Sequence, residues 1–148
     1  MELKTLVPAP VVVSPLYQEL NRWTVLPFLW GETDCCLVLA DWVARVTGRD
    51  PAARIRGMYE TAAECERVTG FLSDPVSAFG SCAAAAGLGR AGELRAGDVG
   101  IYSRPGSRWA FGGLWTGSLW ASKGRDGVTF TKPKRVEILA AWGVGYAG

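Results

Sequence analysis

The chain of 148 residues contains no histidine. This absence excludes every mechanism in which an imidazole accepts or donates a proton, and it removes a common metal ligand. Cysteines are also few: a vicinal pair at 35 and 36, and two isolated residues at 65 and 82. This spacing matches neither a disulfide framework nor a zinc motif, so we expect free thiols, no metal and no cofactor. Free thiols fit a reducing compartment or simple burial.

Long apolar runs and a strong net charge are missing as well. The longest apolar stretches, such as residues 11–13 and 37–40, fall far short of the about 18 residues that a membrane span needs. The N-terminus has an acidic Glu2, two prolines and no apolar signal core, so we expect no signal peptide. A net charge of +2 is too small to indicate a nucleic-acid partner. The densest basic run, Lys132, Lys134 and Arg135, is typical of a solvated face.

The composition is that of a globular protein. Hydrophobic residues make up 49% of the chain and charged residues 20%, which predicts a real core. At this length a single domain is the simplest organisation. The N-terminal stretch differs, because its prolines oppose helix and its valines favour extension. We therefore expect an extended arm over residues 1–14 and one domain over residues 15–148.

Helical spacing of apolar residues dominates the first half of the domain. We expect helices over 15–23, from a cap at Thr33 or Asp34 to residue 46, over 59–69 and over 75–86, with a capped turn at 50–55. Ser14 followed by proline predicts the first helix start, and Gly48 predicts the end of the second helix. The second helix is apolar over a wide arc, so we expect it to be central and mostly buried.

After residue 90 the pattern changes from helix to strand. Turn residues separate a turn and strand at 97–102 from strands at 109–115, 119–122 and 128–131, and a short element at 136–142 ends the chain. Helices first and an antiparallel meander second make an α+β fold. We expect the N-terminal helices to pack on a C-terminal antiparallel sheet.

Aromatic residues crowd into one glycine-rich part of this region, at Trp109, Phe111, Trp115 and Trp120. Two interpretations are open. These side chains pack in the core, or some of them are exposed anchors for another protein, since tryptophan is enriched where interfaces concentrate their binding energy.

Cys35 falls at the expected start of the central helix, between Asp34 and Cys36. A helix N-terminus presents unpaired N–H groups and a partial positive charge. These features stabilise a thiolate and can provide an oxyanion site. Cys35 is therefore a candidate nucleophile, and the competing interpretation is that it only packs in the core.

The residues around Cys35 resemble a known family. The stretch 30–36, Trp-Gly-Glu-Thr-Asp-Cys-Cys, is similar to the tryptophan–glycine and Asp-Cys-Ser-Gly motif of NlpC/P60 peptidases. Downstream, the stretch 97–102, Gly-Asp-Val-Gly-Ile-Tyr, resembles the family's glycine–aspartate strand. The stretch 110–115 falls where the family has its His-Val-Gly-Ile-Tyr strand.

A histidine-lacking Asp-Cys-Cys group found in phage and gene-transfer-agent tails is still more similar. The shared segments are Thr-Gly-Arg-Asp-Pro-Ala-Ala at 47–53, Arg-Gly-Met-Tyr at 56–59 and Ala-Trp-Gly-Val at 141–144. The resemblance covers roughly residues 20–144. It implies a papain-like NlpC/P60-type fold with Cys35 in the place of the nucleophile.

The resemblance also places Ala110 where the family has its catalytic histidine. Alanine cannot carry a proton, and no other histidine replaces it. Asp34, next to Cys35, would oppose ionisation of the thiol. The usual Cys–His mechanism is therefore excluded. The sequence leaves open whether a carboxylate such as Glu32 or Asp98 lies close to Cys35.

Three functions remain as hypotheses. The first is a structural component of a phage-like tail tip or hub, resident in the virion tail, that contacts other tail proteins through residues 1–14 or the 109–120 region. The second is a tail peptidase that cleaves peptidoglycan peptides with Cys35 and an unusual base, from this chain or a partner. The third is an unrelated α+β binding domain.

Overall fold

The computed structural model describes residues 12–148, and this part of the chain has the expected α+β fold. The helices come first: α1 (Pro15–Val25), α2 (Leu37–Thr47), α3 (Ala62–Thr69) and α4 (Pro75–Ala85). The strands follow: β1 (Val99–Ser103), β2 (Phe111–Trp115), β3 (Trp120–Gly124), β4 (Gly127–Thr131) and β5 (Glu137–Trp142), with the short 3₁₀ turn η2 (Pro133–Arg135) before β5. Most of the expected arm lies outside the described residues. Val12 and Val13, which are described, are exposed and have no regular secondary structure.

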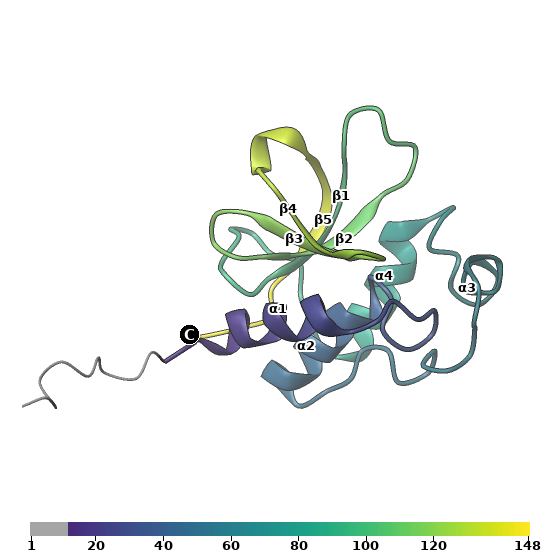
Figure 1. Cartoon of the computed structure of the whole chain (residues 1–148), viewed down its shortest axis with the longest axis horizontal. Coiled ribbons are helices and arrows are strands. Elements are labelled where there is room, and N and C mark those ends of the chain that lie inside the picture. The colour runs from purple at the N-terminus through teal and green to yellow at the C-terminus, as the bar shows by residue number, and fades with distance from the viewer. Residues whose placement is uncertain (1–11) are drawn as a thin grey trace, which may run out of the picture.

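The five strands form one antiparallel sheet in the order β4-β3-β2-β1-β5. The helices lie along one face of it, with α3 out to one side beyond α4 (Figure 1). The expectation of a simple meander holds from β1 to β4 and is wrong for β5, which pairs with β1 at the opposite edge. This pairing sets Trp142 opposite Val99 and Ala140 opposite Ile101, so that all four residues join the helix-facing core.

The helix ends follow their capping residues. Ser14 caps α1 by accepting a hydrogen bond from the N–H of Tyr17, and Gly48 ends α2 in the left-handed conformation, both as expected. α3 begins later than expected, at residue 62, because Thr61 accepts from the N–H of Glu64 and so takes the cap position. Local side-chain hydrogen bonds of this kind compete with helix before the cap and satisfy its first N–H groups after it.

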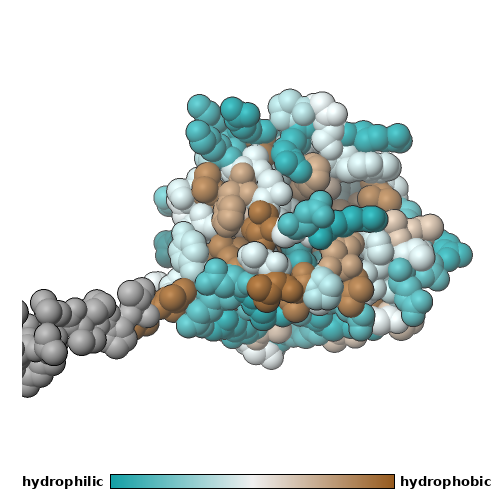
Figure 2. Space-filling view, in the orientation of Figure 1, coloured by the Kyte–Doolittle hydropathy of each residue, from teal (hydrophilic) through white to brown (hydrophobic). Residues whose placement is uncertain are grey.

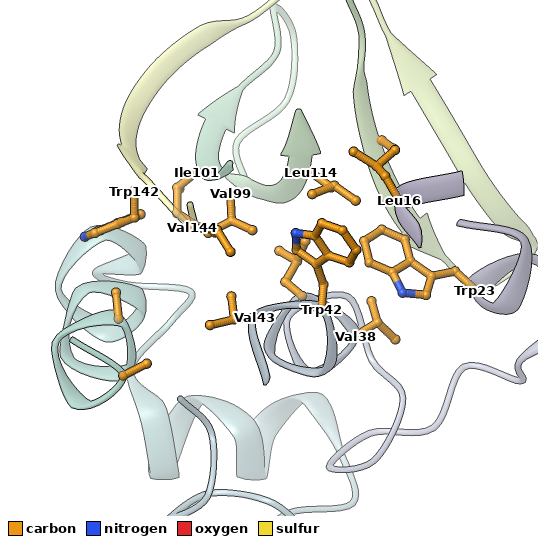
Figure 3. Packing of buried hydrophobic residues seen from close by; sticks show 14 of the residues in the cluster. Leu16, Trp23, Val38, Trp42, Val43, Val99, Ile101, Leu114, Trp142 and Val144 are labelled. Carbon is orange, nitrogen blue, oxygen red and sulfur yellow. The ribbon is translucent and has the colours of Figure 1, made fainter. Parts of the chain in front are cut away.

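The core between the helices and the sheet is built around buried tryptophans. Trp23 of α1 and Trp42 of α2 point toward the sheet residue Leu114, with Val38 of α2 behind them (Figure 3). Both indoles are fully buried, and both N–H groups are satisfied, by Glu19 at 3.0 Å for Trp23 and by the carbonyl of residue 97 at 2.8 Å for Trp42. A buried indole with a partner adds apolar area without an unpaired donor.

A buried lysine fixes the end of α1 to the sheet. Lys123 of β3 is 3% exposed, and its ammonium group donates to the carbonyl oxygens of Trp23 and Leu26 at 2.8 Å each. These carbonyls lie at the C-terminal end of α1, where a cation is favoured by the helix dipole. Burial lowers the pKa of Lys123.

Among the described residues, no helix is long and apolar enough to cross a membrane.

Candidate functional site

The loop before α2 is organised by Asp34. Its Oδ1 accepts hydrogen bonds from the N–H groups of Cys36 at 3.1 Å and Leu37 at 3.0 Å, so Asp34 holds the turn that leads into α2. The expected cap at residue 33 or 34 is wrong by two or more residues, because α2 begins at Leu37 with Cys36 in the N-cap position. Cys35 therefore lies in the turn that leads into α2 rather than inside the helix.

The second oxygen of Asp34 is fully occupied as well. Oδ2 accepts from the N–H of Gly31 at 3.0 Å and from the hydroxyl of Tyr59 at 2.7 Å. The carboxylate is 1% exposed, and four donors compensate its burial. Burial, followed by the charge of Asp34, raises the pKa of Tyr59. Asp34 is thus a structural anchor with no free oxygen for a proton from Cys35.

Gly31 brings the loop close to the segment after α2. Its φ is +80°, and a Cβ at this position would lie 2.0 Å from the carbonyl oxygen of Tyr59. Its own carbonyl accepts from the N–H of Gly57 at 2.9 Å. Only glycine satisfies both the backbone conformation and this close approach. The Trp-Gly and Asp-Cys parts of the motif therefore build one rigid loop.

Cys35 and Ala110 line the same pocket, which has a volume of about 420 Å³. Its walls come from α2, the segment 51–59, α3, α4 and the stretch 109–111 before and at the start of β2. All four cysteines of the chain are free, and all four line this pocket. The pocket, rather than Cys35 alone, is the candidate site, and we call it the four-thiol pocket.

The surroundings of these thiols favour the neutral form. Interaction with the Cys35 thiol, then burial, raises the pKa of Cys36 well above its usual value. Burial raises the pKa of Cys65 and of Cys82. The buried charge of Asp34 adds to the effect at Cys36 and Cys65. Three of the four thiols are therefore poor nucleophiles at neutral pH, because the thiolate is the reactive form.

Neither carboxylate left open by the sequence lies in the pocket. Glu32 is exposed on the loop, and Asp98 accepts hydrogen bonds from the N–H groups of Arg95 at 2.9 Å and Val144 at 3.1 Å. The pocket walls contain no basic side chain, and within residues 12–148 no cluster of ligands could hold a metal ion. The site thus has thiols without a base to activate them.

The aromatic candidates for an interface separate into exposed and buried residues. Trp109 is 44% exposed, whereas Phe111 and Trp115 are partly buried. Trp120 is 0% exposed, so the expectation that it serves as a surface anchor is wrong. Its ring packs against Trp115, with centroids 5.2 Å apart, and against Tyr102 at 5.3 Å. Cross-strand pairing with Trp115 holds Trp120 inside the sheet structure.

Further hydrophobic residues are exposed outside the predicted stretch. The face shown in Figure 2 has hydrophobic residues among hydrophilic ones. Val25 at the end of α1 is 81% exposed, and Phe130 on β4 is 51% exposed. The sequence alone did not reveal these two exposed side chains, because each belongs to an otherwise ordinary helix or strand.

The sequence also did not reveal the far wall of the four-thiol pocket. Cys65 and Cys82 are isolated in sequence and lie on different helices. One signal was present: α4 is rich in alanine and apolar on all sides, yet only Ala83 of this helix is fully buried. A short helix that is apolar all round has to cover a core or line a pocket.

The chain belongs to the family described as a domain of unknown function (DUF6950), whose model it matches over residues 12–144. No curated protein and no solved structure matches the chain.

Proposed function

We propose that this chain is a structural component of a phage-like tail tip or hub, of the siphophage or gene-transfer-agent kind. In this proposal it has an NlpC/P60-like, papain-like fold whose active site is degenerate. The observation that carries the proposal is the four-thiol pocket: Cys35 and Ala110 line one cavity, no basic side chain lines it, and both oxygens of its one carboxylate, Asp34, are engaged in hydrogen bonds. Such an arrangement is expected when a nucleophile position is retained after its histidine is lost.

The proposed partners are other tail-tip or hub proteins, and the proposed location is the virion tail. Trp109 supports a contact role, because its side chain is exposed. In the sequence it follows Arg104 and Arg108 and precedes strand β2. Exposed tryptophan and arginine are the residues that most often anchor protein interfaces. Peptidoglycan is the partner under the alternative function.

A tail-assembly experiment tests the structural role. Particles would be prepared from cells that produce the wild-type chain, the Cys35→Ala chain or no chain, and examined by electron microscopy and with an antibody to the chain. We expect the chain in purified tails, defective tips in its absence, and normal tips with Cys35→Ala. A chain that is absent from purified tails would refute the proposal.

The alternative is an active tail peptidase that cleaves peptidoglycan peptides, with Cys35 as nucleophile and a base supplied by a partner chain. The position of Cys35 in the turn that leads into α2, facing a pocket, favours it. Purified muropeptides would be incubated with wild-type tails and with Cys35→Ala tails. The structural proposal expects no cleavage by either. Cleavage by the wild type alone would establish the peptidase instead.

Restoring the missing side chain tests the resemblance itself. If Ala110 occupies the position of the histidine, Ala110→His places an imidazole in the pocket of Cys35, and the thiol becomes more reactive near neutral pH. Alkylation of Cys35, followed by peptide mass spectrometry, measures this reactivity. Ala84→His, on the exposed side of α4, is the control. A folded Ala110→His chain with unchanged Cys35 reactivity would favour an unrelated α+β binding domain.

A further inference from the structure

The interior of the four-thiol pocket offers almost nothing for a polar ligand to bind. Among its wall residues, Tyr59 donates its hydroxyl proton to Asp34. The hydroxyl of Thr69 donates to the carbonyl of Cys65 at 2.8 Å and accepts from the N–H of Phe71 at 3.1 Å. Most of the other wall residues are aliphatic, aromatic or thiol side chains. The hydroxyl groups of Tyr59 and Thr69 are thus already engaged within the protein, and the predominantly apolar wall favours an apolar ligand.

This chemistry disfavours a peptide backbone buried deep in the pocket. Each residue of an inserted peptide would bring one N–H and one C=O group into a cavity without free partners, and every unpaired group would weaken binding. A single side chain from a partner protein would fill only part of a volume of about 420 Å³. An unbranched hydrocarbon chain brings no polar group and can follow an irregular pocket.

Positive charge lies next to the same pocket. The guanidinium carbon of Arg108 lies 4.6 Å from the ring centroid of Trp109. Trp109 lines the pocket and is 44% exposed, which places it at the rim. Arg108 forms no ion pair with another residue of the described chain. Arginine binds carboxylates well because its donors match their geometry.

We propose that the four-thiol pocket binds a long-chain fatty acid, with the hydrocarbon inside and the carboxylate at Arg108 on the rim. The apolar walls select the chain, and Arg108 selects the negative charge of the head group. This binding does not require that the protein belong to a tail, so its failure and the failure of the structural role are separate results.

The cysteines provide a direct readout on the intact chain. All four line the pocket, so every thiol signal of this protein comes from its walls. Alkylation by a maleimide would be followed with increasing dodecanoate, kept below its micelle concentration. At ten times its dissociation constant, bound dodecanoate should slow alkylation about tenfold. Dodecanoate that leaves the rates unchanged and gives no heat in calorimetry would overturn the proposal.

One neutral and one cationic analogue of dodecanoate test the role of the head group. Methyl dodecanoate should bind more weakly than dodecanoate, and dodecyltrimethylammonium should bind weakest, because Arg108 repels its positive charge. Arg108→Glu should weaken dodecanoate binding about fivefold and leave methyl dodecanoate unchanged. Equal affinities for all three compounds, or an Arg108→Glu chain with unchanged preference, would refute the assigned carboxylate position.

A matched pair of substitutions on α4 tests the location of the chain. Ala78 lines the pocket, and Ala84 lies on the exposed side of the same helix. Ala78→Phe should abolish protection by dodecanoate, and Ala84→Phe should retain it. Circular dichroism and thermal unfolding would verify that both variants fold. If Ala78→Phe does not fold, Ala62→Leu on α3 fills the pocket from the other wall. Full protection in a folded pocket-filling variant would place the ligand elsewhere and refute the proposal.

Discussion

The hydroxyl of Tyr59 donates a 2.7 Å hydrogen bond to Oδ2 of Asp34, a residue that is only 1% exposed. This bond joins the loop that carries Cys35 to the segment that follows α2. With its other oxygen the same carboxylate accepts hydrogen bonds from the N–H groups of Cys36 and Leu37, in the turn that leads into α2. One buried charge thus holds together the helix start, the loop before it and one wall of the four-thiol pocket.

Removing the hydroxyl of Tyr59 should therefore destabilise the domain. We expect Tyr59→Phe to lower the free energy of unfolding by about 2 kcal/mol, since it removes a hydrogen bond to a charged group and leaves that group buried. Urea unfolding measures the change. Tyr17→Phe is the control, because Tyr17 is 50% exposed. Equal effects of the two substitutions would contradict the anchoring role of Asp34.

The close approach at Gly31 predicts a larger effect. Gly31→Ala has to accommodate both a φ of +80° and a Cβ 2.0 Å from the carbonyl oxygen of Tyr59. Gly57→Ala, at φ +73° with open space around the Cβ, meets only the conformational cost of about 1–2 kcal/mol. The midpoint temperature of thermal unfolding should be clearly lower for Gly31→Ala than for Gly57→Ala. A chain that tolerates both substitutions equally would show that the loop can move away from Tyr59.

The buried Lys123 of strand β3 predicts a third loss of stability. Lys123→Met keeps much of the side-chain length but leaves the carbonyl oxygens of Trp23 and Leu26 without their donor. We expect the free energy of unfolding to fall by about 2 kcal/mol, because buried acceptors lose their partner. Lys134→Met, on the exposed turn η2, should change it little. A more stable Lys123→Met chain would mean that burial of the ammonium group destabilises the fold more than its two hydrogen bonds stabilise it.

The thiols should show a characteristic pH dependence. Because the pKa values of Cys36, Cys65 and Cys82 are raised, their thiolate fractions at neutral pH are below that of free cysteine. Iodoacetamide alkylation, read peptide by peptide, should be slow at pH 7 and reach half its maximum above about pH 8.5. The chain unfolded in urea is the control, in which all the cysteines should react alike. If any of these three cysteines reached its half-maximal alkylation rate at a lower pH than free cysteine, the prediction of raised pKa values would be wrong.

The ion pair between Asp50 and Arg56 predicts a change on the acid side. Hydrogen bonding to Arg56 lowers the pKa of Asp50, so the unfolded chain binds a proton at higher pH than the folded one. The stabilisation is therefore complete above the unfolded pKa of about 3.9 and is lost as the pH falls through the folded value. Asp50→Asn should remove up to about 1 kcal/mol at pH 6, and its effect should shrink as the pH falls through the folded pKa of Asp50. Asp126→Asn, in the exposed β3–β4 turn, is the control for stability measured across this range.

Local chemistry made several features predictable. Ser14 and Gly48 act within one helical turn of themselves, so a capping side chain indicates where α1 begins and a left-handed glycine indicates where α2 ends. Periodicity predicted the order of helices before strands. The missing histidine excluded a Cys–His mechanism without any structure.

The tertiary structure decided what depends on contacts between distant residues. The partner of β5 is β1 rather than β4, because that register turns Trp142 toward the helices, and no local signal carries such a choice. Trp109 and Trp120 belong to the same aromatic stretch, yet one is exposed and the other is buried by cross-strand packing. The four-thiol pocket likewise exists only because the turn before α2 and the helices α3 and α4 bring cysteines from three parts of the chain to one cavity. Periodicity and capping act over a few residues, whereas pairing, burial and cavities depend on which surfaces meet after the chain has folded.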